Sequence, residues 1–217
     1  MTNCFIFFSW SSHNNHLLWL DLYNNYYINV SILRQCQNFI NNLFQIYFMT
    51  TALFIGRFQP FHKAHLQDIK NILKECNEVI IAIGSSQYSN TKDNPFSVEE
   101  RIEMIEDILI SEDIGNYTIF PIPDVGDDKK WIEQLITLVP KFDVIYTGNE
   151  WTENCFKKYK KKRFKIKKIK LISGINSTTI RDKILKNEHW QELVPKRVVE
   201  FIEKLKGVER IKKVCSK

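Results

Sequence analysis

From residue 52 onward, short apolar runs alternate with amphipathic stretches. The runs are rich in β-branched residues and end at turn residues, which is typical of strands in βαβ units. The stretches between them carry apolar residues at three- and four-residue spacing, which predicts helices that bury one face. The expected strands are residues 52–55, 78–83, 117–122, 143–147 and 165–172.

The helices are expected between and after these strands. Two apolar periodicities span residues 66–76 and 102–109, and the second follows a capping-box pattern made by Ser97 and Glu100. Further helices are expected at 128–138 and 149–159, with two or three closing helices after Ser177 that break at Pro195. The pattern predicts an α/β fold, a Rossmann-like, doubly wound five-stranded parallel sheet with C-terminal helices. Ligands of such sheets bind at the carboxyl ends of the strands.

Residues 1–48 do not share this pattern. They contain nine Asn and twelve aromatic residues, no Gly, Ala, Pro, Lys or Glu, and no sustained period. We expect a non-matching N-terminal extension, either disordered or preceding a natural start at Met49, and a functional domain at 49–217. The alternative is a genuine extension whose aromatic side chains pack on a partner or on a membrane surface.

The composition narrows the class of protein. Values of 44% hydrophobic and 26% charged residues exclude collagen-like and fully disordered chains. The five cysteines are scattered without a C-x-x-C pair, so neither a disulfide framework nor a zinc knuckle is predicted, and a reducing, cytoplasmic location is expected. With no long apolar window and no signal-peptide pattern, we expect no membrane span.

The loop after the first strand carries the most informative motif, Gly56-Arg57-Phe58-Gln59-Pro60-Phe61-His62-Lys63-Ala64-His65. Gly56 allows close approach of the backbone, and the two His lie at the start of a helix, where free N–H groups attract anions. A zinc site is the alternative for His-x-x-His, but no third ligand stands at a supporting spacing. The motif therefore favours a polyphosphate site.

A second candidate motif, residues 173–181 (Ser-Gly-Ile-Asn-Ser-Thr-Thr-Ile-Arg), also follows a strand and opens a helix. Asn176 or Ser177 can cap that helix, Thr178 offers a hydroxyl group, and Arg181 can bind phosphate oxygens one turn later. Taken alone, the segment fits an ordinary capped surface helix. Two phosphate-competent helix starts in one sheet favour a nucleoside triphosphate held between them.

Together these motifs resemble the nucleotidyltransferases of the H-x-G-H type, and more narrowly the archaeal type of nicotinamide-nucleotide adenylyltransferase. The resemblance covers residues 51–214. It implies that ATP and nicotinamide mononucleotide (NMN) are joined into NAD, with release of pyrophosphate. Further matches lie at residues 83–87, 94–97, 146–149 and 207–211.

The resemblance also implies roles for individual residues. His62 and His65 would bind the triphosphate, with His65 nearest the α-phosphate, and Arg57 and Arg181 would hold its outer phosphates. His62, His65 and Arg181 are therefore the expected catalytic residues. The expected ATP-binding residues are Gly56, Arg57, Phe58, His62, His65, Gly148, Asn149, Thr178 and Arg181.

For the acceptor, the resemblance implies that Asp124 and Trp131 bind NMN, Trp131 by stacking; from periodicity alone, Trp131 is a core residue. Mg²⁺ would accompany ATP without a protein cage, and a homo-oligomer is implied. Other acceptors, namely nicotinate mononucleotide, phosphopantetheine and FMN, stay open.

This chain departs from the family pattern at three places. Ala64 replaces the usual Gly between the two His, Asn176-Ser177 replaces Ser-Gly or Ser-Ser, and Asp93 leaves only Lys92 as a basic candidate nearby. Ten of the fourteen residues from 157 to 170 are basic. A basic nucleic-acid-binding protein is therefore the alternative from another class, but stacking aromatics are sparse in this run, so we expect no nucleic-acid function and infer steering of anionic substrates.

Overall fold

The computed structural model describes residues 35–36, 49–160, 164–169 and 174–215. The chain divides into two compact units, Met1–Phe48 and Met49–Lys217. In the first unit only Gln35 and Cys36 are described, so the expectations for residues 1–48 lie outside the described residues. The fold below is that of the second unit.

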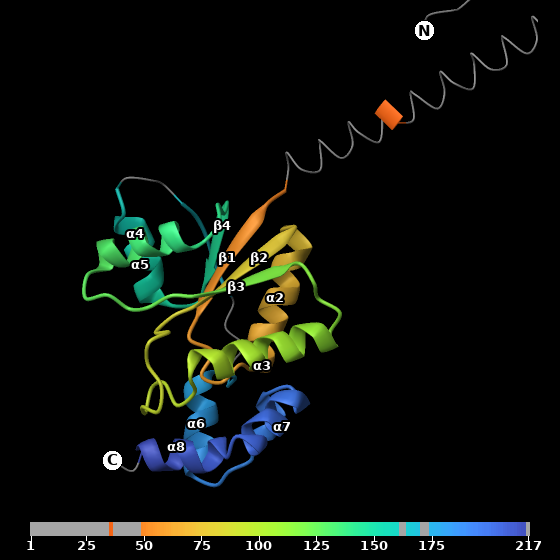
Figure 1. The fold of residues 1–217 in the computed structure, drawn as a ribbon, viewed down its shortest axis with the longest axis vertical. Helices are drawn as coiled ribbons and strands as arrows, with labels where there is room; N and C mark the ends of the chain where they lie inside the picture. Colours follow the sequence, from red (N-terminus) through yellow and green to blue (C-terminus); the bar gives the residue numbers. More distant parts are fainter. Residues whose placement is uncertain (1–34, 37–48, 161–163, 170–173, 216–217) are drawn as a thin grey trace, which may run out of the picture. The chain divides into compact units, whose positions relative to one another are not determined.

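A five-stranded parallel sheet forms the centre of this unit (Figure 1). Its strand order is β3-β2-β1-β4-β5, so the direction of winding reverses between β1 and β4. This confirms the doubly wound sheet predicted from the alternating pattern. The strands are β1 (Thr51–Gly56), β2 (Glu78–Ile83), β3 (Tyr117–Pro121), β4 (Val144–Thr147) and β5 (Lys165–Lys168).

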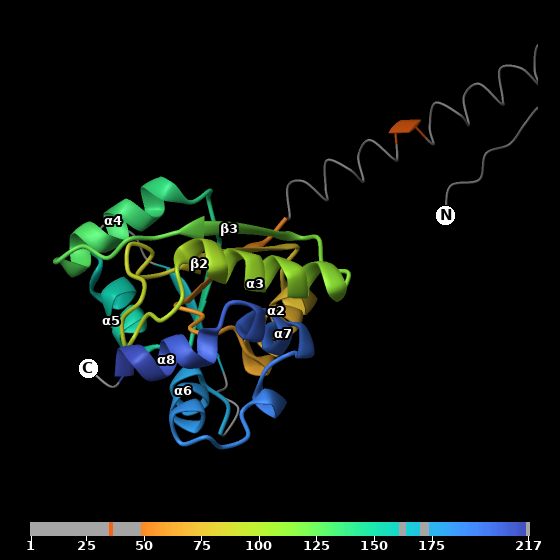
Figure 2. The same ribbon diagram turned by 60° about the horizontal axis from the view of Figure 1, so that its bottom comes forward.

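Helices cover both faces of the sheet (Figures 1 and 2). Alternate residues of β1 enter different cores, because successive side chains of a strand point to opposite faces. Ala52 and Phe54 join one apolar cluster with α2, α3 and the C-terminal helices, whereas Leu53 and Ile55 join a second cluster with α4 and α5. The helices are α2 (Lys63–Glu75), α3 (Val98–Ser111), α4 (Asp128–Leu138), α5 (Glu150–Lys158), α6 (Ser177–Leu185), the short 3₁₀ helix η1 (Gln191–Leu193), α7 (Lys196–Lys204) and α8 (Gly207–Cys215).

Most predicted boundaries agree with the structure. β2 and α4 have the predicted bounds, the Ser97–Glu100 capping box is formed, and Pro195 precedes α7. The fifth strand was predicted to reach residue 172; in the structure it ends at Lys168, residue 169 is not in the strand, and residues 170–173 lie outside the described residues. Its partner β4 ends at Thr147, which pairs with Lys168, so the ladder has no further partner there.

Within the described residues, no helix is both long and apolar enough to cross a membrane. The cysteines in these residues, Cys36, Cys76, Cys155 and Cys215, are free thiols.

Candidate active site

His62 and His65 form a reciprocal cap at the start of α2. The Nδ1 atom of His62 accepts a hydrogen bond from the backbone N–H of His65, and the Nδ1 atom of His65 accepts one from the backbone N–H of His62, both at 3.3 Å. The two rings are stacked with their centroids 3.4 Å apart. His62 is thus the N-cap residue rather than part of the helix, and the two side chains act as one unit.

This cap also determines the proton positions on the two rings. Burial lowers the pKa of His62 to about 4, and burial together with His62 lowers that of His65 well below its ordinary value. Both imidazoles are therefore neutral at pH 7. Because each Nδ1 accepts a hydrogen bond, each ring carries its proton on Nε2. The pair consequently offers two uncharged N–H donors.

The second motif lies against the first. Asn176 caps α6 by accepting a hydrogen bond from the N–H of Thr179 at 2.8 Å. The Ser177 hydroxyl donates to the carbonyl oxygen of Pro60 at 3.0 Å, and Arg181 donates to that of Gln59 at 2.9 Å. The two helix starts identified in the sequence therefore share one site.

A cavity of about 270 Å³ lies between these helix starts and the carboxyl ends of β1 and β4. Of the predicted ATP-binding residues, five line it: Gly56, His62, His65, Gly148 and Asn149. Phe58 does not, because its side chain is buried against Phe54 and His65. The lining is completed by Phe54, Ile55, Ala64, Asp68, Ile169, Ile175, Asn176 and Ser177.

Two arginines lie outside the cavity lining but close to the two motifs. Arg181 is 7% exposed, and its pKa is lowered by burial and by the positive charge of Arg57. Arg57 itself is exposed. Arg181 Nη2 lies 4.0 Å from the carboxylate of Asp93 and 3.5 Å from the hydroxyl of Thr178. Asp93 lies near Arg181 alone, so the two arginines together leave positive charge available for an anion.

Gln59 and Arg101 organise this site, although the sequence patterns did not identify them. Gln59 is 1% exposed, and its side chain exchanges hydrogen bonds with the backbone of Phe96 at 2.8 and 3.0 Å. Arg101 is fully buried and donates to the carbonyl oxygens of Arg57 and Gly84 at 3.1 and 2.8 Å. Gln59 lies within the first motif but had no predicted role, and no motif included Arg101; the long-range contacts reveal what both residues do.

The two predicted NMN-binding residues do not line this cavity. Asp124 is exposed and accepts hydrogen bonds from the hydroxyl and the N–H of Ser85 at 2.7 and 3.2 Å. Trp131 is 2% exposed and packs on Trp151 and Phe156. Trp131 is a core residue in this structure, as its periodicity indicates. The neighbouring Trp151 ring is 47% exposed.

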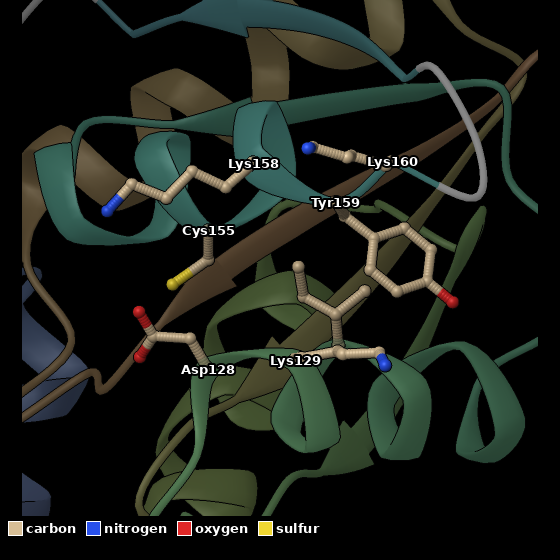
Figure 3. A pocket seen from close by; sticks show the side chains of 7 residues that line it. Asp128, Lys129, Cys155, Lys158, Tyr159 and Lys160 are labelled. Atoms are coloured by element: carbon tan, nitrogen blue, oxygen red, sulfur yellow. The ribbon is translucent and has the colours of Figure 1, made fainter.

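A second cavity, of about 330 Å³, lies between α4 and α5 (Figure 3). It shares no lining residue with the first. Figure 3 shows the Cys155 sulfur facing the Asp128 carboxylate, and burial together with this negative charge raises the pKa of the thiol to about 11. A thiol in that state is a poor nucleophile at neutral pH.

The described residues contain no group of three or more His, Cys, Asp or Glu side chains placed to hold a metal ion. His62 and His65 use their Nδ1 atoms for the helix cap, which leaves Nε2 as the ring nitrogen of each that is not used by the cap.

Comparison with known proteins identifies the family. Residues 53–193 match the cytidylyltransferase-like family model. A nicotinamide-nucleotide adenylyltransferase from Thermoplasma volcanium is 41% identical over 167 residues, which cover 76% of this chain and 92% of the relative. One from Methanococcus maripaludis strain C6 is 42% identical over 168 residues, covering 76% and 96%.

A solved structure also matches. It is a bifunctional NMN adenylyltransferase/ADP-ribose pyrophosphatase from Francisella tularensis, complexed with AMP and a manganese ion. It superposes with a TM-score of 0.62 at 25% identity. The match covers 76% of this chain, and this chain spans about half of that protein, 52% of its length.

The doubly wound sheet, the paired His and the family match define a nucleotidyltransferase of the cytidylyltransferase-like class. Within that class, the identities over nearly the whole length of the relatives are decisive. The chain belongs to the nicotinamide-nucleotide adenylyltransferase family.

Proposed function

We propose that this chain transfers the adenylyl group of ATP to NMN, giving NAD and pyrophosphate. The observation that carries the proposal is the cavity in which the His62–His65 cap and the start of α6 meet, in a chain of this family. In the reaction, a phosphate oxygen of NMN forms a bond to the α-phosphorus of ATP. The bond from that phosphorus to the bridging oxygen breaks, and pyrophosphate carries the electron pair away.

The proposed work of the protein is positioning and charge stabilisation, which is what nucleotidyl transfer requires. The Nε2–H groups of His62 and His65 donate hydrogen bonds to phosphate oxygens, His65 to those of the α-phosphate. Arg57 and Arg181 stabilise the negative charge that moves onto the leaving pyrophosphate, and the start of α6, with Thr178, adds donors. The nucleoside occupies the cavity beside Gly56, Gly148 and Asn149.

For the acceptor, we propose the region around Asp124 and Trp131. Trp131 is covered by the Trp151 ring, with 5.0 Å between the ring centroids. Stacking of nicotinamide on Trp131 therefore requires Trp151 to move aside, which its 47% exposure permits. Because the chain has five tryptophans, the change in fluorescence on addition of NMN is compared between the wild type and Trp151→Phe to assign this movement.

Mg²⁺ is the proposed divalent ion, bound by the phosphates of ATP rather than by a protein cage. Divalent ions supply charge neutralisation of phosphate oxygens. Removal of divalent ions is expected to abolish turnover and Mg²⁺ to restore it, with no requirement for zinc. A zinc requirement would instead favour the metal-site interpretation of His62 and His65.

The assay that tests this function supplies the purified protein with ATP and one acceptor at a time: NMN, nicotinate mononucleotide, phosphopantetheine or FMN. NAD formation and pyrophosphate release with NMN are expected. Activity only with phosphopantetheine or FMN would refute the proposal, and turnover with nicotinate mononucleotide alone would reassign the acceptor. Tight, salt-sensitive RNA binding without pyrophosphate release would favour the nucleic-acid-binding alternative.

Cytoplasmic location and a homo-oligomeric state remain predictions. The free thiols among the described cysteines support a reducing compartment. Light scattering of the purified chain measures the oligomeric state.

A further inference from the structure

Asp68 lines the nucleotide cavity, but the mechanism proposed above does not use it. It lies four residues after Ala64 and four before Ile72, which are 5% and 2% exposed. Residues at this spacing share one face of a helix. Asp68 is therefore an acidic residue on the face of α2 whose neighbouring positions hold buried apolar residues.

The Asp68 carboxyl has no partner in the part of the chain that the structure describes: no hydrogen bond or ion pair reaches it. The side chain is partly buried, and burial raises its pKa to about 7, as expected for a carboxyl without a compensating partner. An uncompensated buried carboxyl costs stability, and such groups are concentrated at functional sites.

The described groups around the cavity offer Asp68 no cation. β1 contributes Phe54, Ile55 and Gly56. From the start of α2, the other titratable side chains that line the cavity are those of His62 and His65, both neutral at pH 7. The other described walls carry no charged side chain; they are Gly148, Asn149, Ile169, Ile175, Asn176 and Ser177. None of the described side chains that line the cavity is bonded to Asp68, so its carboxyl is available to a hydrogen-bond donor on a bound molecule.

The position of Asp68 on α2 indicates which part of the molecule it meets. His65 lies one helical turn closer to the start of α2, where the α-phosphate is proposed to bind, and one turn advances about 5 Å along the helix. In the proposed binding mode the nucleoside follows the α-phosphate into the cavity, on the side of Asp68. Its donors are the ribose hydroxyls and the amino group of adenine.

We propose that the Asp68 carboxyl accepts a hydrogen bond from the nucleoside of ATP, and so sets which nucleotide this site takes. The inference rests on the proposed function and names a specificity-determining residue within it. Loss of the carboxyl weakens nucleotide binding, and only for nucleotides that carry the matching donor.

The test compares the wild type with Asp68→Ala and Asp68→Asn, and with Glu103→Ala as a control for an exposed helical acid. Four nucleotides are used: ATP, 2′-deoxyATP, 3′-deoxyATP and purine riboside triphosphate, which lacks the amino group. Direct ATP binding and kcat and KM with NMN are measured. Thermal unfolding of Asp68→Ala shows that it folds, and its Tm is expected to rise because the buried carboxyl is gone.

Asp68→Ala is expected to raise the KM and Kd for ATP about tenfold or more with little change in kcat. Asp68→Asn recovers part of the loss, because its amide oxygen still accepts. The wild type discriminates against the analogue that lacks the bonded donor, and Asp68→Ala treats that analogue and ATP alike. The analogue that loses discrimination in Asp68→Ala identifies the donor that Asp68 binds, either a ribose hydroxyl or the adenine amino group.

Two results would overturn the inference. The first is that Asp68→Ala binds ATP as tightly as the wild type does, or that it binds ATP more weakly but still discriminates against every analogue as the wild type does. The other is a raised Mg²⁺ requirement with unchanged discrimination, which would make Asp68 a residue that acts on the ion. If the wild type makes NAD and Asp68→Ala has the same ATP affinity and the same kinetics, this inference alone is refuted. If the wild type binds no ATP, the proposed function is refuted as well.

Discussion

At the scale of single residues, the His pair is prepared before a ligand arrives. The Nδ1 atom of each imidazole accepts a hydrogen bond from the backbone N–H of the other residue, so neither ring can rotate without losing that hydrogen bond. Preorganised donors cost no reorganisation during the reaction. Neutral rings also avoid repelling Arg57 and Arg181, the cations that hold the outer phosphates in the proposed mechanism.

Replacement of His65 by Ala is expected to lower kcat by about 10²–10³-fold, because a donor to the transition state is lost. Steady-state kinetics with ATP and NMN measure the effect. His189→Ala is the matched control, since His189 is exposed and lies outside the cavity. Near-normal turnover of His65→Ala would show that the α-phosphate binds elsewhere.

The titratable groups of the cavity predict how stability depends on pH. A His with a lowered pKa stabilises the fold above its unfolded value of 6.5, and this contribution is lost as the pH falls toward the folded value, about 4 for His62. It amounts to roughly 3 kcal/mol for His62, and His65 acts in the same direction. Asp68, with its pKa raised from 3.8 to about 7, opposes them by stabilising the fold at low pH.

Between pH 6.5 and 4 the two His outweigh the single Asp, so acidification is expected to lower the free energy of unfolding. Asp68→Asn removes the opposing contribution and should steepen this loss. Urea denaturation at a series of pH values measures both slopes. A shallower dependence in Asp68→Asn would contradict the assignment of the raised pKa to this residue.

At the scale of elements, α3 connects the loops that form the site. Arg101, in its first turn, donates to the carbonyl oxygens of Arg57, Gly84 and Ser85, so one side chain joins the β1–α2 and β2–α3 loops. Its pKa is lowered to about 10, mainly by burial, and the guanidinium remains charged at pH 7.

Arg101→Met is expected to destabilise the protein by about 3 kcal/mol, because buried carbonyl groups lose their donor. It should also raise the KM for ATP, since the β1–α2 loop carries Arg57. The control is Arg197→Met, which removes an exposed ion pair with Asp107 and should cost less than about 1 kcal/mol. Denaturation and kinetics are measured on both variants, and equal destabilisation would argue against Arg101 as the organiser of the loops.

Elements were predicted well where their signals are local. The bounds of β2 follow from its apolar run, and the start of α3 from the Ser97–Glu100 cap. The end of β5 depends on where its partner β4 stops, which the sequence of β5 does not contain. The same holds for the residues of the site. The motifs around His62 and Arg181 are local and were predicted, whereas Arg101 binds carbonyl groups up to 44 residues away in the sequence and was not.

At the scale of the whole molecule, the first residues of the domain that begins at Met49 form hydrogen bonds within that domain. Thr50 and Asn77 exchange hydrogen bonds at 2.8 and 2.9 Å, and the N–H of Thr51 donates to Asp143 at 2.9 Å. β1 is therefore anchored at its first residues within this unit.

A protein that starts at Met49 is accordingly expected to fold and to keep the activity of the full chain. Circular dichroism, thermal unfolding and NAD synthesis are compared for the two proteins. Aggregation or inactivity of the shorter protein alone would make residues 1–48 a genuine structural element, and the mass of the native N-terminus would show which form cells contain.

Charge acts at the same scale. The net charge of +6 and the basic run at residues 157–170 favour attraction of anionic substrates. Part of that run is engaged locally, since Lys157 and Lys168 pair with Glu153 and Lys167 pairs with Glu75. Added salt is expected to lower kcat/KM for ATP while leaving kcat nearly unchanged, and a salt series measures this directly.

The contact of α8 with the start of α3 has a consequence for synthesis of the protein. Arg210 forms an ion pair with Glu100 at 2.6 Å, beside the residues that Gln59 holds, and Arg181 on α6 holds Gln59 itself. A ribosome makes the chain from its N-terminus, so the sheet can assemble while these arginines are still untranslated or inside the exit tunnel. Arg101 can hold the β1–α2 loop early, but the contacts of Arg181 and Arg210 form only after these residues have emerged. A nascent chain therefore has its sheet before it has a finished site.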